Sequence, residues 1–172
     1  MLIPATINAA TSANPVSLSI KREPQMSSHI SNLAHFVWST SERRDWIRPN
    51  WSEELYAMIG GILNNRNARL IAAGGMADHI HVYASLPSTL CIADAANVMK
   101  SNSSRWVHNE KTEMFAWQTG YGAFTVSWSN EDRVIAYVQN QEEHHRRRDF
   151  KTELLDLLQK HEIKYDERYL WG

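Results

Sequence analysis

The sequence predicts an α+β fold, in which a ferredoxin-like split βαβ sheet carries helices on one face and an additional C-terminal helix follows. Segments rich in β-branched and aromatic residues alternate with segments whose apolar residues recur at helical spacing. Their order is strand, helix, strand, strand, helix, strand, which is the order of the split βαβ unit. In that topology the first and third strands are central. The length of 172 residues suits one domain with a sizeable core.

The first half of the fold is predicted to contain three strands and one helix. The first strand, LAHFVWST, is rich in aromatic and β-prone residues. The helix that follows has Glu53 and Glu54 in its first turn, where the helix dipole favours negative charge. Glycines at the end of the second strand separate two apolar runs and predict a hairpin. In chain order, these elements are expected over residues 33–40, from 49 to an end between 64 and 67, 68–76 and 78–86.

The second half is predicted to contain a long helix, a fourth strand and C-terminal helices. In the long helix, Ile92, Met99 and Trp106 share an apolar face. After the fourth strand, Glu131 and Asp132 mark the start of the helix that carries the candidate tyrosine discussed below. In chain order, these elements are expected over residues 89–110, 120–129, from 130 onward, and 149–161.

Residues 1–28 are predicted to form a disordered N-terminal extension, and residues 29–172 a single domain. The extension is rich in Ala, Ser, Thr, Asn and Pro, and it lacks the charged start and apolar centre of a signal peptide. Met26 is therefore an alternative translational start, which the intact mass of the natively expressed protein would test.

Composition limits the classes of protein that this chain can belong to. No apolar run approaches the ~20 residues needed to span a bilayer, so we expect a soluble, cytoplasmic protein without membrane contact. Cys91 is the single cysteine, which excludes an internal disulfide and a cysteine-rich zinc site. The net charge of −1 gives no general attraction to nucleic acid, so such binding must rely on local patches.

His79 and His81 stand one residue apart in the apolar third strand. Residues i and i+2 of a strand point to the same face, so the two imidazoles project together while Ile80 points the other way. Neutral imidazole nitrogens bind several divalent ions, and the pair therefore forms half of a candidate metal site. The alternative is a pair of histidines on the solvent-facing side of an amphipathic strand.

The helix after the fourth strand offers the other half of this site. Tyr137 and Gln141 are four residues apart and so share one face of a continuous helix. A phenol is a poor nucleophile at neutral pH, but a divalent ion that polarises a phosphodiester lowers the barrier to its attack. Gln141 can supply a neutral oxygen ligand. The alternative is a helix with a half-buried tyrosine and a polar outer side.

Local basic and aromatic residues are the candidates for contact with DNA. Cations pair with phosphates, and exposed indoles such as Trp38 or Trp46 stack on unpaired bases. For each residue, the alternative is a solvated charge or a ring in the core. The basic candidates are Arg43, Arg44, Lys100, Arg105, Arg146, Arg147 and Arg148.

Six segments of the chain carry a resemblance to a known family. They are HFVWST, LYAMIGGIL, GGMADHIHVYASL, KSNSSRW, FAWQTGYGAFTVS and YVQNQEEHH. In this order they resemble the transposases of the insertion-sequence two-hundred/six-hundred-five family and their domesticated REP-associated relatives. The resemblance covers about residues 31–171. The family is of the HUH type, named for histidine, hydrophobic residue, histidine; it has one catalytic tyrosine and acts on single-stranded DNA.

The resemblance implies a role for each matching residue. His79, His81 and Gln141 match the ligands of Mg²⁺ or Mn²⁺, and Tyr137 matches the nucleophile. Attack by the tyrosine would give a 5′-phosphotyrosine and a free 3′-hydroxyl, and a 3′-hydroxyl would later rejoin the strands without a nucleotide cofactor. The resemblance also implies a homodimer that recognises hairpins near the element's ends and associates with the nucleoid when bound to DNA. In many members, the tyrosine helix of one subunit lies against the histidines of the other.

The residues alone are also compatible with two other classes of protein. A non-catalytic single-strand or hairpin nucleic-acid-binding module, or a domesticated REP-associated copy, fits the RRM-like sheet topology. Against the binding module, no GFGFV-like aromatic motif occurs on a central strand. A metallohydrolase that uses the histidine pair is the least favoured, because the H-x-H lacks a following Asp-His and the chain is too short for a typical barrel amidohydrolase.

Overall fold

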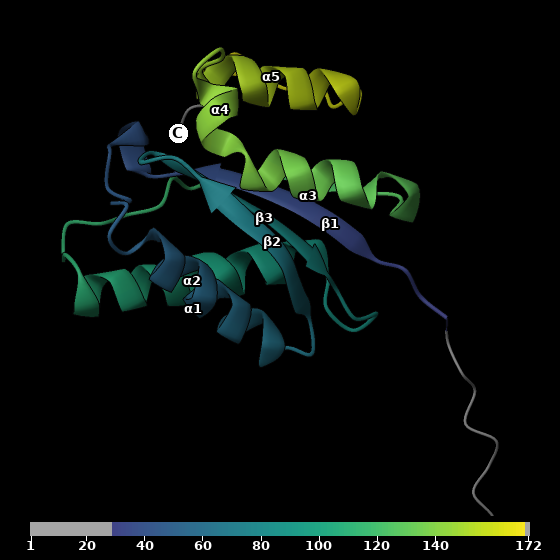
Figure 1. Cartoon of the computed structure of the whole chain (residues 1–172), viewed down its shortest axis with the longest axis horizontal. Coiled ribbons are helices and arrows are strands. Elements are labelled where there is room, and N and C mark those ends of the chain that lie inside the picture. Colours follow the sequence, from purple (N-terminus) through teal and green to yellow (C-terminus); the bar gives the residue numbers. More distant parts are fainter. Residues whose placement is uncertain (1–28, 171–172) are drawn as a thin grey trace, which may run out of the picture.

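A four-stranded antiparallel sheet with helices on both faces forms the described part of the chain (Figure 1). The computed structural model describes residues 29–170. The expected extension over residues 1–28 and the alternative start at Met26 lie outside the described residues. Between residues 29 and 170, no helix has both the length and the apolar character that crossing a membrane requires.

The secondary-structure elements follow the predicted order. The sheet order is β2-β3-β1-β4, which confirms the ferredoxin-like prediction with the first and third strands at the centre. In chain order the elements are β1 Leu33–Ser39, η1 Ser41–Arg43, α1 Ser52–Asn64, β2 Arg69–Gly75, β3 His79–Ser85, α2 Ile92–Glu110, β4 Gly122–Thr125, η2 Trp128–Asn130, α3 Glu131–Gln139, α4 Gln141–His145, α5 Phe150–Lys160 and α6 Glu167–Leu170.

The two faces of the sheet are covered by different helices. On one face, Phe36 and Trp38 of β1 and Ile80 of β3 belong to an apolar core that includes residues of α1 and α2. On the other face lie α3, α4 and α5 (Figure 1). The predicted placement of helices on one face therefore holds for α1 and α2, while the C-terminal helices cover the opposite face. Strand residues that alternate with the first core point toward these C-terminal helices.

The helix that carries Tyr137 is interrupted, whereas the sequence predicted a continuous helix through Gln141. Asn140 separates α3 from α4 with φ −102° and ψ 34°. Its side-chain amide donates a hydrogen bond to the backbone carbonyl of Ala136 at 2.7 Å. Side-chain hydrogen bonds of this kind compete with the backbone hydrogen bonds of a helix. The break lets α4 lead from the end of α3 to α5 (Figure 1).

Helix α3 packs directly on β2 at Gly74. A Cβ atom at this position would lie only 2.0 Å from the carbonyl oxygen of Val138. Val138 is fully buried in a cluster with Ala72 and Tyr83 of the sheet. The missing side chain at Gly74 therefore allows the tyrosine helix to approach the backbone of the sheet.

Candidate metal and tyrosine site

His79 and His81 lie on the central strand β3, on the face that the C-terminal helices cover. Both side chains are fully buried, and their ring centroids are 5.2 Å apart. Ile80, between them, belongs to the core on the opposite face. The strand periodicity thus brings the two imidazoles to one side of the sheet.

Each of the two imidazoles is fixed through its Nδ1 atom. Asp78 Oδ1 lies 2.7 Å from His79 Nδ1, and His35 Nε2 on β1 lies 3.0 Å from His81 Nδ1. Such partners set the orientation of a ring and leave Nε2 available. The Nε2 atoms of both residues are buried and have no hydrogen-bond partner within residues 29–170. Because buried polar atoms normally have a partner, these two nitrogens fit a pair of metal ligands.

Burial lowers the pKa of both His81 and His35 and keeps these two imidazoles neutral. It lowers the pKa of His81 to about 4, although Glu153 acts in the opposite direction. Burial, with a contribution from His81, lowers the pKa of His35 to about 3. Neutral imidazole is the form that binds metal ions, so the site is ready for a cation at neutral pH.

Tyr137 on α3 lies beside the same histidines. Its ring centroid is 5.5 Å from that of His81 and 5.8 Å from that of His35. Its hydroxyl donates a hydrogen bond to the carboxylate of Glu153. Burial and the charge of Glu153 raise the pKa of Tyr137 well above its usual value, with Gln141 acting in the opposite direction. The phenol is therefore protonated at neutral pH and hydrogen-bonded within the site.

Glu153 is a site residue that the sequence analysis missed. It lies on α5, and its side chain is 2% exposed. Burial acts to raise the pKa of Glu153, but its interactions with His145, His81 and Tyr137 outweigh burial and hold the pKa well below its usual range. In the sequence it is a single acid on an amphipathic helix. Only the packing of α5 over the sheet brings this carboxylate to β3.

Gln141 is buried at the start of α4. Its Nε2 atom donates a hydrogen bond to the carbonyl of Tyr137 at 2.9 Å. Its Oε1 atom is buried and has no hydrogen-bond partner in the described part of the chain. Gln141 Oε1 is thus an unpaired neutral oxygen next to the helix that carries Tyr137. Hard divalent ions accept such oxygens as ligands.

Two of the predicted DNA contacts lie away from this site. The Nζ atom of Lys100 donates to the carbonyls of Gln118, Thr119 and Gly120, each at 2.8 Å, so its three donors hold a loop. Arg105 is exposed on α2, which covers the opposite face of the sheet.

Three of the other predicted cations, Arg44, Arg146 and Arg147, form ion pairs at the surface. Arg44 pairs with Glu42 at 2.5 Å. Arg146 and Arg147 pair with Glu143 at 2.9 Å and 3.3 Å. Exposed pairs of this kind contribute little to stability, so they do not fix these guanidinium groups strongly. Arg43 lies in η1 and has a positive φ of 53°.

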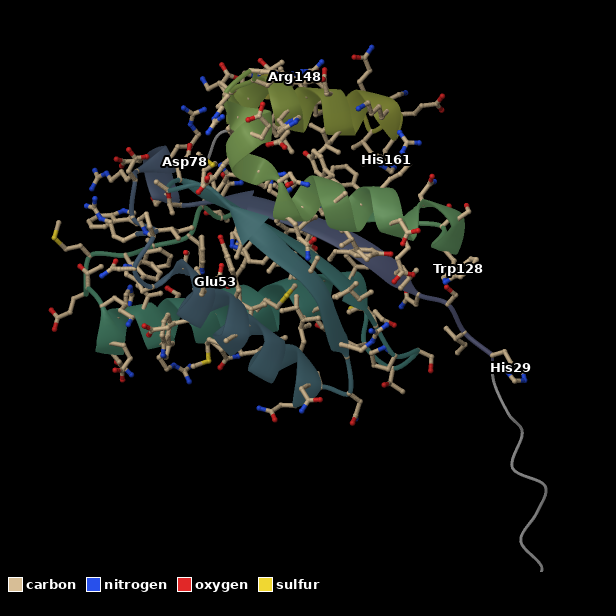
Figure 2. All side chains as sticks on the ribbon, viewed as in Figure 1. His29, Glu53, Asp78, Trp128, Arg148 and His161 are labelled. Atoms are coloured by element: carbon tan, nitrogen blue, oxygen red, sulfur yellow. The ribbon has the colours of Figure 1, made fainter. Side chains whose placement is uncertain are left out.

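A cavity of about 350 Å³ opens beside Tyr137, among residues of β4, α3 and α5. Arg133, Arg148 and Lys160 line it together with Glu153. Figure 2 shows Arg148 and His161 in the layer of C-terminal helices, whereas Glu53 lies on the other side of the sheet. These cations line the same cavity as Tyr137, whereas Lys100 and Arg105 do not.

The prediction that Trp38 stacks on bases is wrong, because its side chain is 1% exposed and lies in the core. Trp46 is partly buried against the same core. Trp128, which the sequence analysis did not select, is 77% exposed just before α3. It is thus a better candidate for stacking than either predicted indole.

Comparison with known families adds independent evidence. The family model described as "Transposase IS200 like" matches residues 28–141. The matched segment includes both histidines of the pair, Tyr137 and Gln141, and it ends before α5. No curated protein matches the chain.

Two solved structures share the fold. A candidate transposase from Deinococcus radiodurans R1 is 19% identical, with a TM-score of 0.55 over 69% of this chain and 98% of that chain. A REP-associated tyrosine transposase bound to a REP hairpin is 14% identical, with a TM-score of 0.50 over 67% of this chain and 70% of that chain. At these identities the likeness establishes the fold, and the family match establishes the relationship. The chain belongs to the family of IS200-like transposases.

Proposed function

We propose that this transposase cleaves and rejoins single-stranded DNA, with Tyr137 as the nucleophile and with Mg²⁺ or Mn²⁺ held by His79, His81 and Gln141. The observation that carries the proposal is the convergence of the Tyr137 hydroxyl and the unpartnered Nε2 atoms of the two histidines on the carboxylate of Glu153. The unpaired Oε1 atom of Gln141 fits the third ligand. When bound, the ion would polarise the scissile phosphate and stabilise negative charge on its oxygens.

The chain's own residues would then carry out two transesterifications. The Tyr137 oxygen forms a bond to phosphorus while the bond from phosphorus to the 3′ oxygen breaks, which leaves a 5′-phosphotyrosine. Glu153 accepts the hydrogen bond of the phenol and is placed to receive its proton, which finally resides on the released 3′-hydroxyl. In the second step, a 3′-hydroxyl attacks the phosphotyrosine and Tyr137 regains a proton. Each step exchanges one phosphoester bond for another, so no nucleoside triphosphate is required.

Hairpin DNA is the substrate that we propose. The structural relative is bound to a REP hairpin, which supports this substrate class. The cavity beside Tyr137, with Arg133, Arg148 and Lys160 in its lining, suits a single strand whose phosphate approaches the phenol. We also propose a homodimer, as in the family that the sequence resembles. Within this chain, Tyr137 already lies against its own His81, so a site can form within one subunit.

The test is covalent capture of DNA. The purified protein and its Tyr137→Phe variant are incubated with Mn²⁺ and labelled single strands from the flanks of the gene, and the products are separated by denaturing electrophoresis. Tyr165→Phe is the matched control, because Tyr165 is an exposed tyrosine beyond α5.

The proposed chemistry predicts a protein-linked band for the parent protein and for the control. This band should vanish in Tyr137→Phe or after addition of a chelator. Hairpin binding without any adduct would instead support a non-catalytic binding module or an inactive, domesticated REP-associated copy. Persistence of the adduct in Tyr137→Phe would exclude Tyr137 as the nucleophile.

A further inference from the structure

Two residues outside the predicted ligand set lie within reach of the histidine pair. His145 on α4 and Glu153 on α5 each offer one ligand atom. These atoms lie within 4.8 Å of one another and of the ligand atoms of His79 and His81. Both residues lie beyond the segment that the family model matches, which ends at residue 141. The family model therefore does not cover them, although His145 ends the YVQNQEEHH segment that carries the resemblance.

One carboxylate oxygen of Glu153 is the centre of this cluster. Glu153 Oε2 lies 3.1 Å from His145 Nε2, 3.4 Å from His81 Nε2 and 3.8 Å from His79 Nε2. Of these contacts, only the one with His145 is a hydrogen bond. The Nε2 atoms of His79 and His81 are buried and lack a hydrogen-bond partner among the described residues. Hydrogen bonds therefore leave these two nitrogens without a partner, whereas a cation bound by the whole cluster would give them one.

We propose that His145 and Glu153 bind the same divalent cation as His79 and His81, in addition to Gln141, and that this site prefers Mn²⁺ or a later first-row ion to Mg²⁺. The inference rests on the proposed metal-dependent function and deepens it. Mg²⁺ prefers an octahedral set of oxygen ligands, whereas imidazole suits the transition ions. Three imidazoles and one carboxylate form a nitrogen-rich set, and the carboxylate offsets half of the cation's charge in a buried place.

The local structure holds Glu153 in position for this role. Asp149 caps α5 by accepting a hydrogen bond from the backbone N–H of Thr152 at 2.8 Å. Phe150 stacks on the ring of His79, with ring centroids 4.5 Å apart. Leu154 on the next turn packs in a cluster with residues of β1 and β4. Helix α5 is thus attached to the sheet on both sides of Glu153, which pre-organises the carboxylate.

The same carboxylate connects the cation site to the nucleophile. While Oε2 faces the three imidazoles, Oε1 accepts the hydrogen bond of Tyr137. Glu153 would therefore be a ligand and also a positioning residue for the phenol. A substitution that removes the charge of Glu153 should weaken metal binding in the absence of DNA, which separates this role from any effect on DNA cleavage.

The experiment measures metal binding to the full chain without DNA. Binding of Mn²⁺ is followed by loss of the electron paramagnetic resonance signal of the free ion, and binding of Mg²⁺ by competition. Glu153→Gln keeps the shape of the side chain and removes its charge. Glu110→Gln is the matched control, since Glu110 is exposed at the end of α2. His145→Gln, on the partly buried ligand, provides a second variant if Glu153→Gln fails to fold.

The parent protein should bind Mn²⁺ at least about tenfold more tightly than Mg²⁺. Glu153→Gln and His145→Gln should each weaken Mn²⁺ binding by at least about tenfold, because loss of even an outer-shell partner typically costs 10–100-fold in affinity. Glu110→Gln should bind as the parent does. The inference is overturned if the folded Glu153 or His145 variant binds Mn²⁺ as tightly as the parent or more tightly, or if the parent shows no preference over Mg²⁺.

Failure of this inference and failure of the proposed function give different results. A parent protein that forms the tyrosine adduct while the variants bind Mn²⁺ normally would overturn only the assignment of His145 and Glu153 as ligands. A parent protein that binds Mn²⁺ as described and forms no adduct on any flanking strand would overturn only the proposed transesterification.

Discussion

His35 on β1 and His81 on β3 are joined across the two central strands, with His35 Nε2 3.0 Å from His81 Nδ1 and the rings stacked at a centroid distance of 5.2 Å. When His81 donates the hydrogen bond in this contact, it carries its proton on Nδ1. In that tautomer the lone pair of Nε2 is available to a cation. His35 therefore acts as a positioning residue for the candidate metal site.

Replacement of His35 by Phe should weaken Mn²⁺ binding by about 10–100-fold, because the aromatic ring is kept but the acceptor for His81 Nδ1 is lost. The unfolding free energy should fall by about 1–3 kcal/mol, since a buried donor is left unpaired. Titration with Mn²⁺ and urea denaturation measure the two effects. His29→Gln, at an exposed histidine, is the control. Unchanged metal affinity in His35→Phe would show that His35 does not position His81.

Replacement of Gly74 by Ala should displace the tyrosine helix, because the new Cβ would lie 2.0 Å from the backbone oxygen of Val138. We expect a loss of about 1–3 kcal/mol in unfolding free energy and a reduced yield of the tyrosine adduct. Gly61→Ala is the matched control: nothing lies within 4 Å of its Cβ, and it should stabilise α1 by about 0.5–1 kcal/mol. Equal adduct yields in Gly74→Ala and Gly61→Ala would show that the reaction does not depend on the close approach of α3 to β2.

Replacement of Lys100 by Met should affect stability more than DNA affinity. Its ammonium group holds three carbonyls of the loop before β4, so we expect a loss of about 1–3 kcal/mol in unfolding free energy. The salt dependence of hairpin binding should stay unchanged, whereas loss of a phosphate contact would reduce its slope by about 1. Arg147→Met, at an exposed ion pair, is the comparison and should change stability by less than about 0.5 kcal/mol. A reduced salt slope in Lys100→Met would restore the sequence-based assignment of Lys100 to phosphate binding.

The contact between Tyr137 and His81 of the same chain predicts a site that forms within one subunit. Mixed dimers of Tyr137→Phe and His81→Ala should then form no tyrosine adduct, because neither subunit contains a complete site. Mixed dimers of the parent protein and Tyr137→Phe should retain the adduct and serve as the control. Recovery of the adduct in the first mixture would show that the tyrosine helix works on the histidines of the other subunit.

The sequence determined the order of the elements and half of the candidate site, because these depend on local periodicity. Alternation along a strand brings His79 and His81 to one face, and helical spacing, with acidic residues in the first turn, marks the helix that carries Tyr137. The crossover order of the strands follows from the split βαβ pattern and gives the central position of β3. None of these conclusions requires knowledge of how the C-terminal helices pack.

Only the tertiary structure decided which further residues surround the histidine pair. Glu153 is far from His81 in the sequence and meets it because α4 turns after the break at Asn140 and α5 returns across the sheet. His35 becomes a partner of His81 through the pairing of β1 with β3. Periodicity shows which way a side chain faces within its own element. It does not show which distant element lies opposite, because that depends on the packing of the whole chain.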